Sequence, residues 1–385
     1  MTTHLFQTYS RRGVEIVKGD GTKVMDRNGK EYLDFTSGIA VCNLGHCHPK
    51  LVEAVTKQMK EMWHISNLFP SKLQEEVAAK LTKNEGLDYV FFCNSGAEAN
   101  EAALKLARKH TGKSVFITFQ QSFHGRTFAT MSATGQPKVH DGFGPLLPTF
   151  LHLPFNDIKA LQEAMNEEVA GVMVEVVQGE GGVGLANYDF LKEIERLCNH
   201  YGALYIVDEV QTGIGRTGTM FSYEQTGTLP HIVTVAKALG NGIPIGAMIG
   251  KSELANTFTA GTHGSTFGGN FLSMTAAKEV LHIIDDSAFL KEVMHKGEYL
   301  HNLLQQELQS VDCIYEVRGK GLLIGIQFTC DVTPIVLKLE EKGLLVLQAG
   351  TNVLRILPPL TVTEEEMNQA VQIIKSVCNE LLFIK

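Results

Sequence analysis

The feature that most constrains this chain is a repeated alternation between short apolar segments and longer amphipathic ones. The apolar segments are YVFFCN (89–94), SVFITF (114–119), GVMVEVV (171–177), ALYIVDEV (203–210) and HIVTVA (231–236). The amphipathic segments between them have the helical spacing of apolar residues, as at 96–110 and 188–202. Strands that are apolar on both faces, with helices between them, are typical of a mainly parallel sheet covered on both sides. The pattern therefore predicts an α/β fold.

The 385 residues are too many for one ordinary core, so we expect two domains. The alternation of strands and helices predicts a large domain over residues 48–270. Before it, residues 18–35 carry the Asp-Gly and Asn-Gly steps of hairpins. After it come long helical stretches and two further apolar strands. We expect these two ends, residues 1–47 and 271–385, to build a smaller α+β domain together.

Charge and cysteine content exclude several classes of partner and compartment. The net charge of -8 disfavours nucleic acid and acidic membranes, since both attract basic surfaces. The first residues, MTTHLFQTYSRR, lack the apolar core of a signal peptide, and no apolar run is long enough to cross a bilayer. The seven scattered cysteines suit reduced thiols better than a disulfide framework. We expect a cytoplasmic protein that binds neither nucleic acid nor membrane.

Two charged residues stand directly at the ends of apolar strands, where ligands gather in parallel sheets. Lys237 follows HIVTVA, and burial there lowers the pKa of an amine and favours the neutral form that Schiff-base chemistry needs. Asp208 ends ALYIVD, and a carboxylate at that depth needs a partner, such as the protonated ring nitrogen of a pyridine cofactor. Each residue alone has a commoner explanation, a lysine that reaches the surface or an aspartate that caps a helix.

Two loops after strands carry groups that suit a phosphorylated aromatic ligand. Residues 94–97, Asn-Ser-Gly-Ala, join a strand to a helix whose free N–H groups attract a phosphate. Phe123 and Arg126 offer an aromatic face and a guanidinium that can clamp a carboxylate. The alternatives are a simple capped turn, a core aromatic residue and a surface arginine.

Two other motifs point to different chemistry. Cys42, His46, Cys47 and His48 resemble a metal cluster, but three of them are adjacent and their side chains cannot easily converge, so we expect no metal. Residues 179–184 match G-x-G-x-x-G after a strand, which leaves a NAD-dependent dehydrogenase as an alternative. Three residues separate the last glycine from the helix, however, and this alternative gives Lys237 and Arg126 no role.

Taken together, the motifs resemble the class-III aminotransferases, which are fold-type-I enzymes that depend on pyridoxal 5'-phosphate (PLP). The resemblance covers nearly the whole chain. It is carried by YIVDEVQTGIGRTG (205–218) followed by VAKALGNGIPIGA (235–247), and by FCNSGAEANEAALKLAR, FHGRT, EVVQGEGGV, GSTFGGN, VRGKGLLIGI and NVLRILPPLTVTEEE. The chain departs from the family pattern at His231 and Phe271, which usually are aspartate and proline.

The resemblance implies a role for each candidate residue. Lys237 would bind the cofactor covalently and move the proton, while Asp208 would pair with the ring nitrogen and Gln211 with the ring oxygen. The backbone of Gly96 and Ala97 would hold the phosphate. Phe123 would cover the ring, Arg126 would bind the α-carboxylate of the substrate, and Ser265 would contact the substrate. Thr266 would bind the phosphate of the neighbouring subunit, in a homodimer with shared active sites. Glu180 and Arg355 would form a switch pair. In that pair Glu180 would mask Arg355 while the amine donor is bound, and would release it to bind 2-oxoglutarate.

The reaction that the resemblance implies moves the δ-amino group of N2-acetyl-L-ornithine to 2-oxoglutarate. The products are N-acetyl-L-glutamate 5-semialdehyde and L-glutamate, as in arginine biosynthesis. The sequence leaves open other ω-amino donors, which are succinyl-diaminopimelate, succinylornithine, ornithine and 4-aminobutyrate. A catalytically silent regulator that binds PLP is a third class, and the intact set of Lys237, Asp208, Arg126 and Arg355 argues against it.

Overall fold

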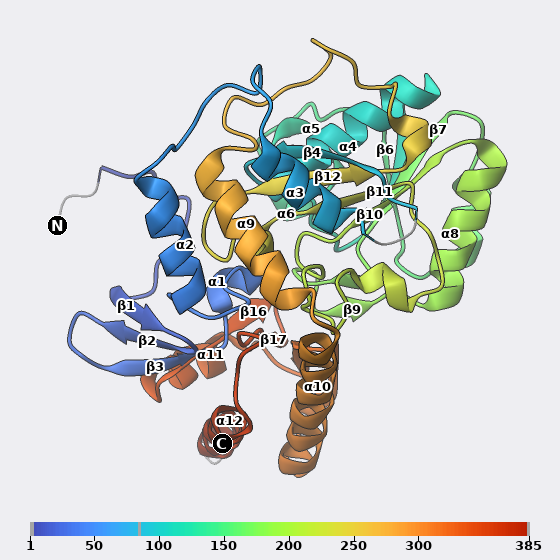
Figure 1. Cartoon of the computed structure of the whole chain (residues 1–385). Helices are drawn as coiled ribbons and strands as arrows, with labels where there is room; N and C mark the ends of the chain where they lie inside the picture. The colour runs from blue at the N-terminus through green and yellow to red at the C-terminus, as the bar shows by residue number, and fades with distance from the viewer. Residues whose placement is uncertain (1–3, 84–85, 383–385) are drawn as a thin grey trace.

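The computed structural model describes residues 4–83 and 86–382, which form a seven-stranded sheet flanked by helices and a second region of smaller sheets (Figure 1). The strand order of the large sheet is β4-β12-β11-β10-β7-β5-β6. Only β12 runs antiparallel to its neighbours, so the prediction of a mainly parallel sheet is confirmed. The strands are β4 (Tyr89–Cys93), β5 (Val115–Phe119), β6 (Phe150–Leu153), β7 (Val169–Val174), β10 (Leu204–Asp208), β11 (Ile232–Val235) and β12 (Gly246–Gly250).

Helices cover both faces of this sheet because alternate residues of each buried strand point to opposite sides. On β10, Leu204 and Ile206 belong to the core cluster that contains apolar residues of α4 (Gly96–Thr111). Tyr205 and Val207 belong to the other cluster, with apolar residues of α8 (Tyr188–Tyr201). Each strand is therefore apolar throughout, which is the pattern that the sequence displays.

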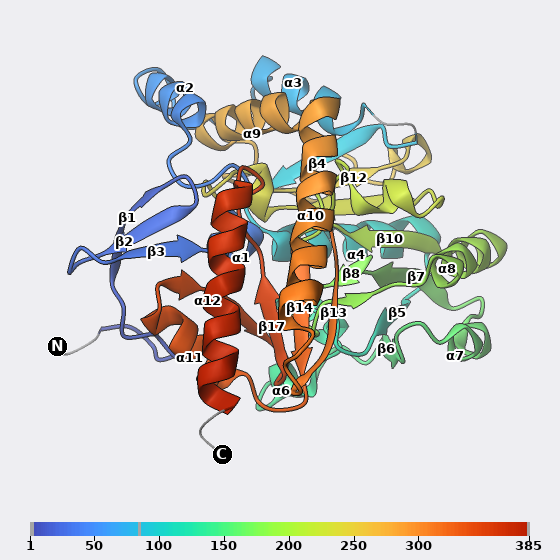
Figure 2. The same cartoon turned by 90° about the horizontal axis from the view of Figure 1, so that it is seen from below.

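The remaining helices connect the strands or pack around the smaller sheets. In Figure 2, α10 and α12 lie side by side, and contacts between the two helices agree with this view. The helices are α1 (Ser37–Ala40), α2 (Pro49–Met59), α3 (Lys72–Leu81), α5 (Phe128–Ala133), α6 (Pro137–His140), α7 (Ile158–Ala164), α9 (Phe271–Ile284), α10 (Ser287–Leu308), α11 (Thr333–Glu341) and α12 (Glu364–Leu382). Within the described ranges, no helix is both long and apolar enough to span a bilayer.

The smaller sheets draw their strands from both ends of the chain. One has the order β1-β2-β3-β15, and its last pair joins Leu33 and Asp34 to Leu344 and Leu345 in parallel. The other has the order β13-β14-β17-β16. Distant segments thus share one sheet, and the division into residues 48–270 and a domain built from 1–47 and 271–385 stays a proposal. The strands are β1 (Ile16–Asp20), β2 (Lys23–Asp26), β3 (Glu31–Asp34), β13 (Ile314–Lys320), β14 (Leu323–Phe328), β15 (Leu344–Leu345), β16 (Leu347–Ala349) and β17 (Val353–Ile356).

The two departures from the family pattern have local structural roles. His231, at the start of β11, accepts a hydrogen bond at Nδ1 from the backbone N–H of Tyr205 at 3.0 Å. Phe271 begins α9 and donates its backbone N–H to the carbonyl of Trp63 at 3.1 Å. A proline at position 271 has no N–H, so it could not make this bond.

Candidate active site

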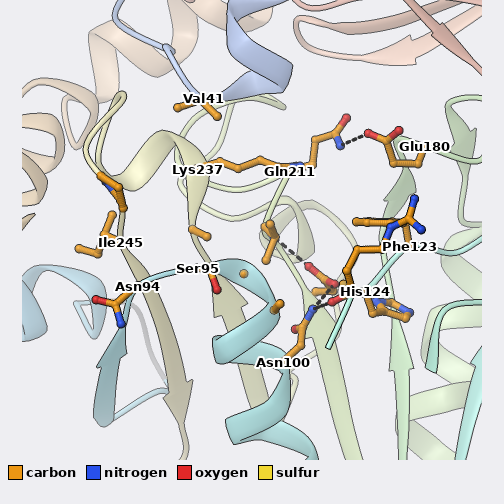
Figure 3. Close-up of a pocket in the computed structure, with 18 of the residues that line it drawn as sticks. Val41, Asn94, Ser95, Asn100, Phe123, His124, Glu180, Gln211, Lys237 and Ile245 are labelled. Atoms are coloured by element: carbon orange, nitrogen blue, oxygen red, sulfur yellow. Dashed lines mark hydrogen bonds and ion pairs between the residues drawn. The ribbon is translucent and has the colours of Figure 1, made fainter. Parts of the chain in front are cut away.

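A cavity of about 380 Å³ opens at the edge of the large sheet where the parallel strands end (Figure 3). Its size is within the range of sites that bind small molecules. Lys237, Asp208 and Arg126 all line it, although they are far apart in the sequence. The cavity therefore brings together the residues at the ends of β10 and β11 with the loop after β5.

Lys237 follows β11 and lies in a short 3-10 turn (Lys237–Leu239). Its φ of 44° is in the left-handed region, which is uncommon for a residue with a side chain and is often found at functional sites. Burial lowers the pKa of its amine, and the charge of Arg355 lowers it further, against the opposite effects of Glu180, Asp208 and Glu175. Among the described residues its amine has no hydrogen-bond or ion-pair partner, so it is free to bind a group that enters the cavity.

Asp208 ends β10, is 3% exposed, and is fixed by three hydrogen-bond donors. Its Oδ2 accepts from Asn100 Nδ2 and from His124 Nδ1, both at 2.8 Å, and its Oδ1 accepts from the backbone N–H of Val210 at 3.0 Å. Asn100 is itself held, because Thr234 donates to its Oδ1 at 2.6 Å. The carboxylate therefore has a set position on the cavity wall.

Two buried titratable groups stand behind this carboxylate, and the sequence did not identify either as functional. Burial opposes protonation of His124, but the hydrogen bond and charge of Asp208, together with the charge of Glu175, outweigh it and raise its pKa. Burial raises the pKa of Glu175 to about 7, and Asp208 adds to this, while Glu175 accepts the backbone N–H of Phe123 at 2.9 Å. The available signal was a carboxylate within the apolar run GVMVEVV.

The N-terminus of α4 forms another wall of the cavity. Ser95 caps the helix by accepting the N–H of Glu98, and the cavity lining includes Ser95, Gly96 and Ala97. A Cβ added to Gly96 would lie 2.7 Å from a methyl group of Val210, so only glycine lets the helix start approach the turn after Asp208. Helix α4 thus directs free N–H groups toward the cavity, where an anion is stabilised.

Phe123 and Arg126 lie on the loop after β5 and line the same cavity. The guanidinium carbon of Arg126 is 5.7 Å from the ring centroid of Phe123. Arg126 is exposed and forms no ion pair with any described residue. Its charge is therefore available to a carboxylate that enters from solvent.

Glu180 and Arg355, the switch pair of the sequence analysis, are in contact. Nη1 of Arg355 donates to Oε1 of Glu180 at 2.6 Å. The side chain of Arg355 is 2% exposed and that of Glu180 is 29% exposed, so Glu180 is the partner with room to move. Burial alone would raise the pKa of Glu180, but the charge and hydrogen bond of Arg355 outweigh it and lower that pKa. Gln211, a cavity residue, contacts both members of the pair.

Arg355 does not line this cavity itself but donates to the cavity residues Glu180 and Gln211. Ser265 and Thr266 are the other predicted site residues that do not line it. They lie with Phe91, Glu98 and His263 around a separate surface hollow. The hydroxyl of Ser265 accepts from Asn94 Nδ2 at 3.1 Å, which joins this loop to the end of β4. The assignment of Thr266 to the phosphate of a neighbouring subunit stays a prediction.

The sequence analysis also missed a strained turn that leads to the cavity. Ser37, Gly38, Ile39 and Ala40 all have φ between 47° and 67°, a left-handed turn of four residues. Such a turn costs about 1–2 kcal/mol for each residue with a side chain. It delivers Val41 to the cavity wall. Strain of this kind is often concentrated at ligand sites.

The glycines at 179–184 do not form a phosphate-binding turn that opens a helix. Strand β8 (Val177–Gln178) pairs antiparallel with β9 (Gly184–Leu185), so the glycines form the turn of a small hairpin. Helix α8 begins later, at Tyr188. The dehydrogenase alternative required these glycines to lead into a helix, and this requirement is wrong.

The lining of the cavity fits PLP. It combines an amine of lowered pKa, a fixed carboxylate, an aromatic ring and a helix N-terminus, which are the groups that suit an aldehyde, a protonated pyridine, a planar ring and a phosphate.

Comparisons with known proteins agree with this chemistry. A family model described as aminotransferase class-III matches residues 7–378. An acetylornithine aminotransferase of Bacillus cereus is 70% identical over 377 residues, which are 98% of each chain. The structure is similar to that of an ornithine aminotransferase from Toxoplasma gondii, with a TM-score of 0.95, 33% identity, and coverage of 99% of this chain and 94% of that one. An N-acetylornithine aminotransferase from Stenotrophomonas maltophilia gives a TM-score of 0.86 at 36% identity, over 98% of both chains.

Proposed function

Because the chain belongs to the class-III aminotransferases, we propose that it moves the δ-amino group of N2-acetyl-L-ornithine to 2-oxoglutarate. The products are N-acetyl-L-glutamate 5-semialdehyde and L-glutamate. The observation that carries the proposal is the meeting of Lys237, Asp208 and Arg126 in one cavity, with Arg355 bonded to the cavity residues Glu180 and Gln211. Arg126 is open to solvent, whereas Arg355 is covered by the carboxylate of Glu180. Two substrates that differ in their carboxylates require such a difference.

The cofactor of this enzyme is PLP. When bound, it supplies an electron-accepting ring that makes the proton on the amine-bearing carbon of the substrate removable. Lys237 would hold it covalently, Asp208 would face its ring nitrogen, and Phe123 would lie against its ring. The N–H groups of Gly96 and Ala97 would bind its phosphate.

Lys237 is also the proposed general base and acid of the reaction. Its free amine would remove the proton from the amine-bearing carbon of the substrate and would later return a proton. Burial lowers the pKa of this lysine, which favours the neutral amine that the role needs. Because the first product would leave before the second substrate binds, we expect ping-pong kinetics.

The two arginines would distinguish the two substrates. Arg126 would bind the α-carboxylate of acetylornithine, so that the distant δ-amine would reach the cofactor. Glu180 would cover Arg355 during that half-reaction and would leave it when 2-oxoglutarate brings a second carboxylate. The Nε of Arg355 is buried without a partner among the described residues, so the protein leaves part of its donor capacity unused.

We further propose a homodimer in the cytoplasm that serves arginine biosynthesis. Apolar side chains are exposed near the loop that carries Ser265 and Thr266, notably Trp63, Leu68 and Phe267. Asn67 donates to the carbonyls of residues 265 and 268, which holds the two segments together. An exposed apolar surface of this kind marks a protein interface, and pairing across it would supply Ser265 and Thr266 to the neighbouring site.

A panel of amine donors with 2-oxoglutarate tests the proposed substrate. We expect the highest kcat/KM for N2-acetylornithine among acetylornithine, succinylornithine, succinyl-diaminopimelate, ornithine and 4-aminobutyrate. The purified protein should also be yellow from the bound cofactor. A higher kcat/KM for ornithine would instead favour the activity named for the Toxoplasma gondii relative.

A further inference from the structure

Gln211 forms a hydrogen-bonded bridge across the switch pair. Nη1 of Arg355 donates to Oε1 of Gln211 at 3.0 Å, while Nε2 of Gln211 donates to Oε1 of Glu180 at 3.4 Å. Arg355 Nη1 also donates to Glu180 Oε1, so the three side chains close a ring of hydrogen bonds. In Figure 3 the carboxamide of Gln211 points toward Glu180, and the side chain of Lys237 extends toward Gln211.

This position of the carboxamide depends on the absence of a side chain at residue 179. A Cβ added to Gly179 would overlap Oε1 and Cδ of Gln211 and would lie 2.7 Å from its Nε2. The nearest atoms are all at the flexible end of the glutamine, so a methyl group would displace the amide without disturbing the backbone. The φ of Gly179 also lies outside the left-handed region, so alanine can adopt its conformation.

We propose that Gly179 and Gln211 are positioning residues for the acceptor half-reaction, because they hold the Arg355 guanidinium in place when Glu180 leaves it. The inference rests on the proposed function, which assigns Arg355 to 2-oxoglutarate. Gln211 is buried beside Arg355, whereas Glu180 is partly exposed. When Glu180 moves away, Oε1 of Gln211 remains as an acceptor for Nη1. The buried cation is then not left without a partner before the incoming carboxylate arrives.

The geometry also separates this role from the binding of the amine donor. Arg126, the proposed site of the donor carboxylate, lies on a different loop and forms no hydrogen bond with Gly179, Gln211 or Arg355 among the described residues. Because Gln211 would also face the ring oxygen in both half-reactions, displacing its amide should weaken the binding of dicarboxylates more than it slows the donor half-reaction.

The test uses the holoenzyme and glutarate, a dicarboxylate that lacks the keto group and cannot react. Calorimetric titration should show that Gly179→Ala weakens glutarate binding by about tenfold, the effect of one hydrogen bond to a charged group. The KM for 2-oxoglutarate should rise similarly, while the single-turnover rate with the amine donor should fall by a smaller factor than the glutarate affinity. Equal glutarate affinity in the variant and the wild type would overturn the inference.

Two controls make the test specific. Gly184→Ala adds the same methyl group to the same hairpin, where the nearest atom would be 3.7 Å away, and it should change neither measurement. In a double-mutant cycle, Gly179→Ala should cost nothing further in a Gln211→Ala background, since the displaced amide is gone. Additive losses would mean that Gly179 acts through the backbone and would overturn the inference. Failure of the wild type to transfer the donor amine would reject the proposed function instead, because glutarate binding does not require turnover.

Discussion

The two sides of the cavity hold a carboxylate in opposite ways. Asp208 is buried and accepts from Asn100, His124 and a backbone N–H. Glu180 is partly exposed, its short bond is to a single partner, Arg355, and it comes from a hairpin turn. A carboxylate with several fixed donors keeps its position, whereas one with a single strong partner can exchange it for another anion.

This difference suits the two tasks of a transaminase. The side at Asp208 must have the same charge in both half-reactions, since the same ring nitrogen is faced each time. The side at Arg355 must offer a cation to one substrate and hide it from the other. The number of hydrogen-bond donors to a carboxylate, rather than its burial alone, therefore decides whether its charge keeps one partner or exchanges it for another.

The largest expected effect comes from Lys237, which lies between the two sides. Lys237→Ala should lower kcat by at least about 10⁴-fold, because nucleophile and base are lost together. The protein should still fold, with a Tm near that of wild type, since this residue has no partner in the described structure. Borohydride reduction of wild type should fix the cofactor on the peptide that contains Lys237. Label on another lysine would contradict the assignment.

Asp208→Asn tests the side of the cavity at Asp208, because the substitution keeps the shape of the side chain and removes its charge. We expect kcat to fall by about 10³-fold in both half-reactions, because an amide cannot hold a proton on the ring nitrogen. Single-turnover absorbance measurements with each substrate would report the two losses separately. If kcat fell in only one half-reaction, Asp208 would not keep the same role in both, and it would not differ from Glu180 in the way proposed.

Arg355→Ala tests the other side, where Glu180 is bonded to Arg355. The variant should lose about 3 kcal/mol of dicarboxylate binding, or about 10²-fold in kcat/KM for 2-oxoglutarate. The half-reaction with the amine donor should change little, since Arg355 is covered by Glu180 at that stage. Parallel losses in both half-reactions would show that this side is fixed as well.

The smallest effect concerns a pair away from the cavity, His46 with Asp34, whose atoms Nε2 and Oδ2 are 2.7 Å apart. The hydrogen bond to Asp34 raises the pKa of His46 to about 10. A folded pKa above the unfolded value of about 6.5 adds stability that is complete below that value and is lost as pH rises toward 10. Between pH 7 and 10 the wild type should therefore lose about 1 kcal/mol, or about 2 °C in Tm, more than His46→Gln. Equal slopes would show that this pair does not titrate as a charged pair.

The sequence predicts the large sheet well because its strands are apolar on both faces and stand out from their surroundings. Strands β10 and β11 lie at the expected positions, and the helix at 96–110 differs from α4 by one residue. The strands β6 and β12 were not expected. Strand β12 is bracketed by Gly246 and Gly250, and β6 follows a stretch with several prolines and glycines, so both resemble loops.

The candidate site was predictable where a charged residue directly follows such a strand, as for Lys237 and Asp208. The groups behind them were not. His124 and Asn100 act through contacts between elements, which no spacing along the chain reveals. The left-handed turn before Val41 was equally hidden, since Ser37, Ile39 and Ala40 have no intrinsic preference for that conformation.

The parallel pairing of β3 with β15 has a consequence for how the polypeptide matures. The hairpin at the start of the chain cannot complete its sheet until residues near 345 have left the ribosome. At about 5–20 residues per second, the first strands wait for tens of seconds with an unpaired edge. Chaperones that shield such edges should therefore matter more for the yield of this enzyme than for its final stability.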